Sequence, residues 1–172
     1  MTRRASRGFS LMELVVVIVL LGMMFATGAN MVSDTMRTAY TVTNNYASGS
    51  QARYATERLT REIREMAYAS AGYNITTMTS TSLAFSKEDG TSVTINYASP
   101  TLTLKYGSTT STISDQVSSF ALAYYDQLGA TTTDVAEIRF VQITLSVVNS
   151  KTGTTDSLRT RIFLRNAEMS VT

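Results

Sequence analysis

Residues 7–22, RGFSLMELVVVIVLLG, join a basic residue, a glycine, an aromatic residue and a single acid to a long apolar run. After Glu13, the stretch Leu14–Ala29 contains no charged residue. With Phe9–Met12 included, the segment has about 21 residues and spans roughly 30 Å as a helix, which is enough to cross a bilayer. The arginines before it predict a cytoplasmic N-terminus: Arg3, Arg4 and Arg7. The stretch therefore predicts a single membrane-spanning helix, with the remainder of the chain outside the cytoplasm.

Two ordinary explanations of this segment remain open. A cleaved secretory signal would have a shorter apolar region followed by a small-x-small cleavage site, for which Ala26–Ala29 is a weak match. A plain signal anchor would place Glu13 at the level of the lipid headgroups, where the start of the helix dipole also favours an acid. Neither explanation accounts for the spacing of the glycine, the aromatic residue and the acid.

Arg7–Leu14, RGFSLMEL, resembles the class III signal of type IV prepilins and type II secretion pseudopilins. That signal has a short basic leader ending in Gly, then Phe, a small polar residue, Leu, an aliphatic residue and Glu before a long apolar run. The resemblance implies cleavage by a membrane prepilin peptidase after Gly8 and N-methylation of the new N-terminal residue, Phe9. Glu13 would be the fifth residue of the mature chain, which would keep the apolar run.

The same resemblance implies a role for Glu13 in assembly. An ionised carboxylate in lipid costs several kcal/mol unless it is paired. Cleavage after Gly8 creates a positive amine at Phe9, which can meet the Glu13 carboxylate of a neighbouring subunit that is shifted axially. Glu13 is therefore predicted to help set the register between subunits. The expected partners are prepilin peptidase, other minor and major pilins or pseudopilins, and the inner-membrane assembly platform.

Composition limits the remaining functions. The 172 residues contain 15 Lys and Arg against 13 Asp and Glu, but three of the arginines precede the apolar run. The rest of the chain has no basic surplus, so nucleic-acid binding is not favoured. The sequence contains no Cys and no His, which excludes disulfides and thiolate or imidazole metal sites and disfavours catalysis. We predict that the protein is not an enzyme, and we assign no cofactor or metal; the acids of Glu88–Gly90 and Asp126–Gly129 fit turns.

The helix is predicted to continue beyond the membrane. Ser33–Ser50 is small and polar, which is consistent with a weakly helical, flexible neck. Charged pairs four residues apart, such as Arg58 with Glu62, indicate a solvated helix face. The predicted helix end is Ala71–Gly72, whose glycine takes the C′ position. Over Gln51–Ala71, we expect the sheet to pack on an apolar-to-small stripe at helical spacing: Ala52, Ala55, Leu59, Ile63, Met66 and Ser70.

After the glycine at position 72, the apolar period becomes two and predicts antiparallel strands. Ser82–Ser86 and Thr91–Tyr97 form a predicted hairpin around Asp89-Gly90. The other predicted strands are Thr101–Tyr106, Val117–Tyr125, Glu137–Val148 and Leu158–Leu164, with turns or loops at Gly107–Thr110, Gly129–Asp134 and Asn149–Thr155. The last two strands are expected to pair as a long hairpin. In Leu158–Leu164, one face carries Leu158, Ile162 and Leu164, and the other carries Arg159, Arg161 and Phe163. In Glu137–Val148, the candidates for burial are Ile138, Phe140, Ile143 or Val141, Leu145 and Val147.

Together these elements predict an α+β, pilin-like fold, in which a long N-terminal transmembrane and amphipathic helix packs on an antiparallel β-sheet domain. The expected divisions are a prepilin leader at residues 1–8, the transmembrane half of the helix at 9–30, its periplasmic half at 31–72, and the β domain at 73–172. The resemblance implies a single-pass protein of the bacterial inner membrane whose C-terminal domain is periplasmic and which later joins a filament.

Within this family, a minor pilin or pseudopilin that primes or caps assembly is favoured, because the apolar half lacks the proline that many major pilins place there. Arg58–Arg64 and Arg161–Asn166 also resemble the J-type minor pseudopilins and the O-type minor pilins of mannose-sensitive haemagglutinin pili. A major pilin and a DNA-binding competence minor pilin are alternatives, and the latter would use a basic strip of Arg159, Arg161 and Arg165. The sequence does not choose between pilus, secretion and competence systems.

Overall fold

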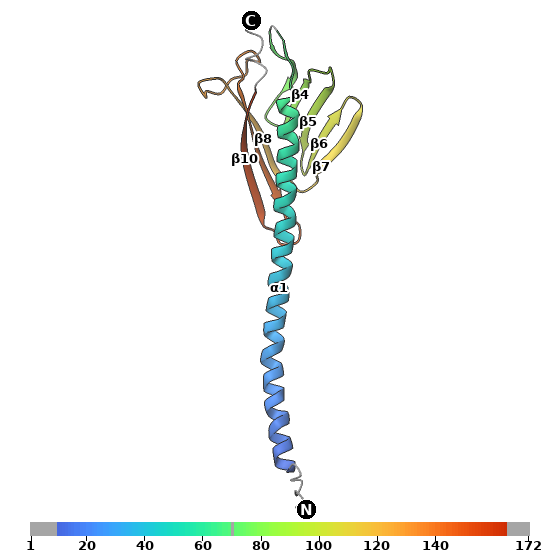
Figure 1. Ribbon diagram of the computed structural model, residues 1–172, viewed down its shortest axis with the longest axis vertical. Helices are drawn as coiled ribbons and strands as arrows, with labels where there is room; N and C mark the ends of the chain where they lie inside the picture. Colours follow the sequence, from blue (N-terminus) through green and yellow to red (C-terminus); the bar gives the residue numbers. More distant parts are fainter. Residues whose placement is uncertain (1–9, 70, 165–172) are drawn as a thin grey trace, which may run out of the picture. The chain divides into compact units, whose positions relative to one another are not determined.

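The computed structural model describes residues 10–69 and 71–164, and the chain divides into two units, Met1–Thr43 and Asn44–Thr172. One helix, α1 (Leu11–Arg64), begins in the N-terminal unit and ends in the C-terminal unit (Figure 1). All of the strands lie in the C-terminal unit. The long N-terminal helix and the antiparallel sheets in the C-terminal part confirm the predicted α+β, pilin-like architecture.

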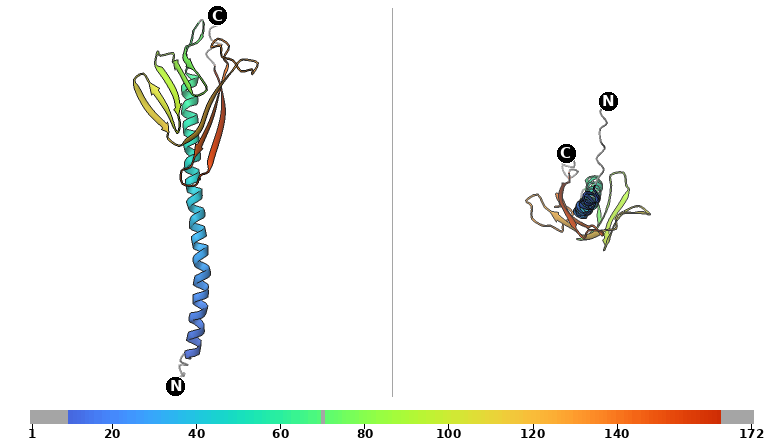
Figure 2. Two further views of the ribbon diagram at one scale, coloured as in Figure 1. Left: turned by 180° about the vertical axis from the view of Figure 1, so that it is seen from behind. Right: turned by 90° about the horizontal axis from the view of Figure 1, so that it is seen from below.

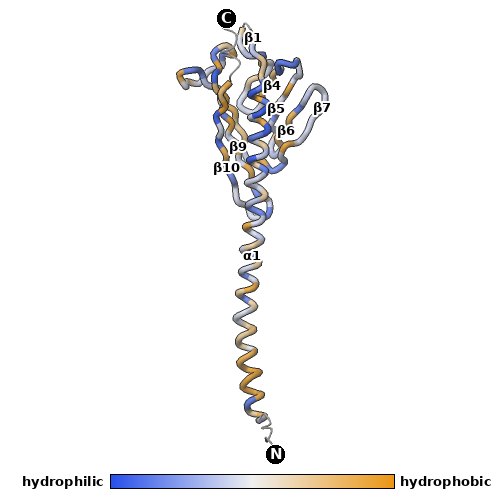
Figure 3. Tube along the Cα trace, viewed as in Figure 1, coloured by the Kyte–Doolittle hydropathy of each residue, from blue (hydrophilic) through white to orange (hydrophobic). Residues whose placement is uncertain are grey.

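In the N-terminal unit, α1 is long and apolar enough to cross a membrane, and the side chains of its apolar run are exposed. Figure 3 shows the change from this apolar part to the mixed composition further along the helix. The polar segment that follows is also helical. Its threonine hydroxyls donate hydrogen bonds to carbonyls four residues earlier in the same helix, at Thr35, Thr38, Thr41 and Thr43. The predicted neck is therefore part of α1, and its threonines satisfy their polar groups within the helix.

The described residues of the C-terminal unit form three antiparallel sheets. A five-stranded sheet has the order β3-β4-β5-β6-β7, a three-stranded sheet has the order β10-β9-β8, and β1 pairs with β2. The strand bounds are β1 Tyr68–Ala69, β2 Gly72–Tyr73, β3 Ile75–Met78, β4 Ser82–Ser86, β5 Ser92–Ala98, β6 Thr101–Tyr106, β7 Thr109–Ser114, β8 Val117–Tyr125, β9 Phe140–Val148 and β10 Thr155–Phe163.

The two larger sheets lie on either side of the part of α1 that belongs to the C-terminal unit (Figure 2). This part of the helix buries four members of the predicted stripe, and a fifth, Met66, is buried just beyond the helix end. The four helix members are Ala52, Ala55, Leu59 and Ile63. Ser70, the last predicted member, lies outside the described residues. Apolar side chains from both sheets complete the core, including Phe85, Ile95, Leu102, Ile143 and Ile162. The helical spacing therefore identified the face on which the sheets pack.

Most of the predicted strands are confirmed. β4 and β5 form the expected hairpin, and β9 and β10 pair from Thr155 opposite Val148 to Phe163 opposite Phe140. The predicted turn at Gly107–Thr110 is partly wrong, because β7 begins at Thr109 and pairs with β6. Its side chains are mostly exposed hydroxyls, so no apolar alternation marks this strand. The edge strand β3 was not predicted either, because its two apolar residues, Ile75 and Met78, do not alternate with its threonines.

The burial predictions for Glu137–Val148 hold with the exception of Phe140, and the predicted apolar face of the last strand faces the core. Ile138, Val141, Ile143, Leu145, Val147, Ile162 and Leu164 are buried. Phe140 is only partly buried, because β9 begins at this residue and its side chain lies on the outer face against Phe163, with 5.4 Å between ring centroids. Leu158 is also only partly buried. Ile138 is buried although it precedes the strand, so the predicted start of the strand at Glu137 is three residues early.

The predicted helix end at Gly72 is wrong. α1 ends at Arg64, and Met66 then forms an isolated β-bridge with Lys87, so sheet structure begins where helical spacing in the sequence continues. Gly72 lies in β2 with φ of +120°. A Cβ atom built at this position would lie 2.8 Å from the backbone N and Cα of Ala136. This glycine is therefore needed for both its backbone conformation and the close approach of another backbone segment.

We expect Gly72→Ala to lower the free energy of unfolding of the C-terminal unit by about 2 kcal/mol, because the methyl group meets backbone that cannot rotate away. Chemical denaturation of the full chain in detergent, followed by the near-UV circular dichroism of its tyrosines, measures the change. Gly90→Ala is the matched control, since Gly90 also has a positive φ, of +81°, but a Cβ there meets nothing within 4 Å. Equal losses in the two variants would show that the contact with Ala136 is unimportant.

Candidate functional site

The first turn of α1 is capped by Ser10. The Ser10 carbonyl oxygen accepts hydrogen bonds from the backbone N–H groups of Glu13 at 3.1 Å and Leu14 at 3.2 Å. The Ser10 hydroxyl oxygen also accepts from the Glu13 N–H, at 3.2 Å. This is the geometry of an N-cap residue, and the Ser-x-x-Glu spacing before an apolar run is the sequence signal that indicates it. Glu13 consequently lies where the helix dipole favours a negative charge.

The other predicted site residues in this region, Gly8 and Phe9, lie outside the described residues. Glu13 is exposed, and the residues that follow it in α1 present exposed apolar side chains. In the part of the chain that the structure describes, no lysine or arginine forms an ion pair with Glu13. The start of the helix therefore carries a single carboxylate ahead of an apolar segment, and no cation among the described residues pairs with it.

A second carboxylate, Glu62, is buried near the other end of α1. Its side chain is 3% exposed and forms ion pairs with Lys87 from the β4–β5 turn and with Arg58, whose Nε lies 3.4 Å from Oε1. Lys87 Nζ also lies 2.7 Å from Glu65 Oε2. The predicted pairing of Arg58 with Glu62 is confirmed, but the interpretation of this pair as a solvated surface feature is wrong. Lys87, which is distant in sequence, converts the pair into a link between helix and sheet.

The aromatic ring of Tyr106 completes this cluster. Arg58 Nη2 donates a hydrogen bond to Tyr106 Oη at 2.7 Å, and Lys87 Nζ lies 5.5 Å from the ring centroid. Burial alone would raise the pKa of the Glu62 carboxyl, but its contacts with Lys87, Tyr106 and Arg58 outweigh this effect and lower the pKa below its usual value. Glu62 therefore stays ionised, and the cluster joins α1 to β6 and to the β4–β5 turn.

The candidate basic strip is only partly described. Arg159 and Arg161 lie on β10 with exposed side chains, whereas Arg165 lies outside the described residues. The acids assigned to turns do form turns: Asp89 Oδ1 accepts from the Thr91 N–H at 2.8 Å, and Asp126 Oδ1 accepts from the Leu128 and Ala130 N–H groups at 2.9 and 2.8 Å. Among the described residues, no three His, Cys, Asp or Glu side chains gather as a potential metal site.

Comparison with known families identifies one match, over residues 3–29, to the prokaryotic N-terminal methylation motif. The match covers the basic leader, the Gly8-Phe9 bond, Glu13 and most of the apolar run. No curated protein matches the chain. The motif supports a pilin- or pseudopilin-type subunit that is processed by a prepilin peptidase and assembles with other pilins, and the apolar helix fits a single membrane anchor.

Proposed function

We propose that this chain is a minor pilin or pseudopilin that primes or caps the assembly of a type IV pilus or a type II secretion pseudopilus. The observation that carries the proposal is the methylation motif at residues 3–29, followed by a helix that is long and apolar enough to span a membrane. The absence of proline from the apolar segment favours a minor over a major subunit. The hydroxyl-rich body, which lacks a basic surplus, favours a structural subunit over a DNA-binding one.

In this proposal the protein is inserted into the bacterial inner membrane by residues 9–30, with Arg3, Arg4 and Arg7 on the cytoplasmic side. A prepilin peptidase removes residues 1–8 by cutting between Gly8 and Phe9, and the new amine of Phe9 is methylated. The C-terminal unit is periplasmic before assembly. Ser10, the N-cap, is then the second residue of the mature chain, so cleavage leaves the start of α1 intact and places a positive amine next to it.

The amine and the Glu13 carboxylate are complementary charges in an apolar setting. Within one chain they lie at the same end of a helix, whereas an axial shift between two neighbouring chains brings the carboxylate of one towards the amine of the other. Pairing removes the penalty that each charge would have alone in lipid, and it favours one axial register over others. Glu13 is thus proposed as an assembly residue, with other pilins and the inner-membrane assembly platform as partners.

Mass spectrometry of the intact protein tests the processing step. In cells that contain a prepilin peptidase, we expect a chain that begins at Phe9 and carries one added methyl group. Without the peptidase, we expect the residues before Phe9 to be retained and the methyl group to be absent. Gly8→Ile should prevent cleavage, because a branched side chain replaces the smallest residue at the scissile bond. Ser6→Ile is the matched control and should be processed normally. A chain cut after Ala29, or one that remains uncut with the peptidase present, would contradict the proposal.

A further inference from the structure

Strand β10 has an unpaired edge whose residues can be identified from the ends of its hydrogen-bond ladder. The Asn149 N–H donates to the Thr154 carbonyl at 2.8 Å, and the Leu164 N–H donates to the Arg139 carbonyl at 2.9 Å. Bonding alternates along an antiparallel pair, so even-numbered residues of β10 bond to β9. The odd-numbered residues direct their N–H and C=O groups away from β9: Thr155, Ser157, Arg159, Arg161 and Phe163. Within residues 10–69 and 71–164, no segment pairs with this edge.

The same odd-numbered residues carry the side chains of the outer face, and two of them are cations. The guanidinium of Arg161 lies over the Tyr125 ring, 4.3 Å from its centroid, and 5.9 Å from that of Phe140. Phe163, which is 38% exposed, packs beside Phe140. No described carboxylate lies within 4.0 Å of Arg159 or Arg161. Within the described part of the chain, the edge therefore presents two positive charges that form no ion pair, about 7 Å apart along the strand.

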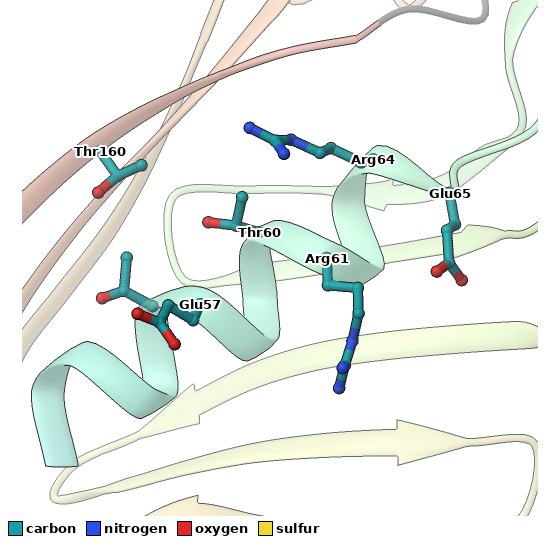
Figure 4. Close-up of a pocket in the computed structure, with 7 residues that line it drawn as sticks. Glu57, Thr60, Arg61, Arg64, Glu65 and Thr160 are labelled. Atoms are coloured by element: carbon teal, nitrogen blue, oxygen red, sulfur yellow. The ribbon is translucent and has the colours of Figure 1, made fainter. Parts of the chain in front are cut away.

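A groove borders β10 on the side that faces α1. This groove has a volume of about 600 Å³ and is lined by Thr160 on the strand, by Glu65 just beyond the helix end, and by helix residues Thr56, Glu57, Thr60, Arg61 and Arg64. Figure 4 shows Thr160 on β10 and the other labelled side chains on or just beyond the facing helix. An added strand would direct alternate side chains into this groove and the others onto the outer face. The groove side is lined by hydroxyls and by acids and bases together, so only the outer face has a clear charge preference.

We propose that the β10 edge binds an extended segment of a different protein, which adds a strand to the three-stranded sheet and places two carboxylates, two residues apart, opposite Arg159 and Arg161. Main-chain hydrogen bonds from the free edge provide general affinity, and the charge pairs select the segment. The occupant is not a second copy of this chain, because no two acids in its 172 residues are separated by one residue. The proposal does not depend on cleavage or on filament assembly.

Selection from displayed peptides tests this proposal with the full chain in detergent micelles. The probes are two libraries of nine-residue peptides, one with Asp fixed at positions four and six and a matched one with Asn at both positions. We expect binders only from the Asp library. Their affinity should fall roughly tenfold for the chain with Arg159→Glu and Arg161→Glu, since both charge pairs become repulsive. Arg159→Lys with Arg161→Lys, which keeps the charge, should retain most of the binding.

Methylation of alternate peptide amides distinguishes strand addition from simple charge attraction. Methyl groups on the amides that face β10 should abolish binding, whereas methyl groups on the other set of amides should be tolerated. The proposal would be overturned if the two libraries gave equal yields, or if neither gave binders. It would also be overturned if methylation of either set of amides left the affinity unchanged. A single-stranded oligonucleotide serves as a further probe. Tight binding of it that depends on the same two arginines would overturn the proposal in favour of a nucleic-acid surface.

Discussion

Replacing Glu62 with Gln is expected to lower the free energy of unfolding of the C-terminal unit by about 3 kcal/mol, which corresponds to a fall in Tm of roughly 6 to 12 °C. The substitution keeps the shape of the side chain but removes the charge that Lys87 and Arg58 share. Lys87 is 13% exposed, and among the described carboxylates it then pairs only with the more exposed Glu65. The measurement is the thermal transition of the full chain in detergent, followed by the near-UV signal of its tyrosines.

Two further variants show whether the link between helix and sheet is the cause. Glu57→Gln removes an exposed acid from the same helix and should change Tm by less than about 2 °C. Replacing both Glu62 and Lys87 with Met should cost less than Glu62→Gln alone, because no buried charge is left unpaired. If Glu57→Gln and Glu62→Gln were equally destabilising, the cluster would contribute nothing specific.

The pH dependence has a defined direction. The pKa of Glu62 in the folded protein is lower than its ordinary value of 4.5, since Lys87, Tyr106 and Arg58 outweigh the effect of burial. The stabilisation from this ionised carboxylate is therefore fully present above about pH 4.5 and is lost as the pH falls through the folded-state pKa. The difference in stability between the wild-type chain and Glu62→Gln should decrease over that range. A difference that stayed constant down to pH 2 would contradict this account.

The sequence predicts those parts of the fold that are held by a regular apolar pattern. Leu59 and Ile63 recur at helical spacing, and Val141, Ile143 and Leu145 alternate, so both buried faces could be identified without the structure. β7 lacks such a pattern, because backbone pairing with β6 holds it in place and its side chains are mostly exposed hydroxyls. The end of α1 was missed for a related reason. The stripe continues to Met66, but that residue bridges to Lys87 instead of extending the helix.

The candidate sites also differ in whether the sequence alone could predict them. The methylation motif is a contiguous sequence signal, and its match at residues 3–29 could be anticipated from Gly8, Phe9 and Glu13. The environment of Glu62 could not be predicted in this way, because local spacing indicated only Arg58 as a partner. The main partner, Lys87, is distant in sequence and is brought close by the packing of the five-stranded sheet. The free edge of β10 likewise depends on the strand order, which, among the described strands, places β10 beside β9 alone.

The second large effect is expected when Glu13 is replaced, and it concerns assembly into the filament. If its carboxylate pairs with the Phe9 amine of a neighbouring subunit in lipid, Glu13→Leu leaves that amine unpaired and costs about 3 kcal/mol per contact. Incorporation into the assembled filament should then fall on the order of a hundredfold. The fraction of the chain in filaments, compared with that in membranes, gives the measurement. Cleavage and membrane insertion should persist, because the basic leader, Gly8 and the apolar run are unchanged.

Ser10→Ala separates this role from a contribution to the start of the helix. The Ser10 hydroxyl accepts from the Glu13 N–H, so its loss weakens the cap by about 1 kcal/mol while the carboxylate remains. If Glu13 acted only through the helix start, the two variants would reduce assembly to a similar, modest extent. If Glu13 pairs with the amine, Glu13→Leu reduces assembly far more than Ser10→Ala does. Adding Glu13→Leu to the uncleaved Gly8→Ile chain should then reduce assembly little further, because cleavage has not created the amine at Phe9. Full additivity of those two changes would rule out the ion pair.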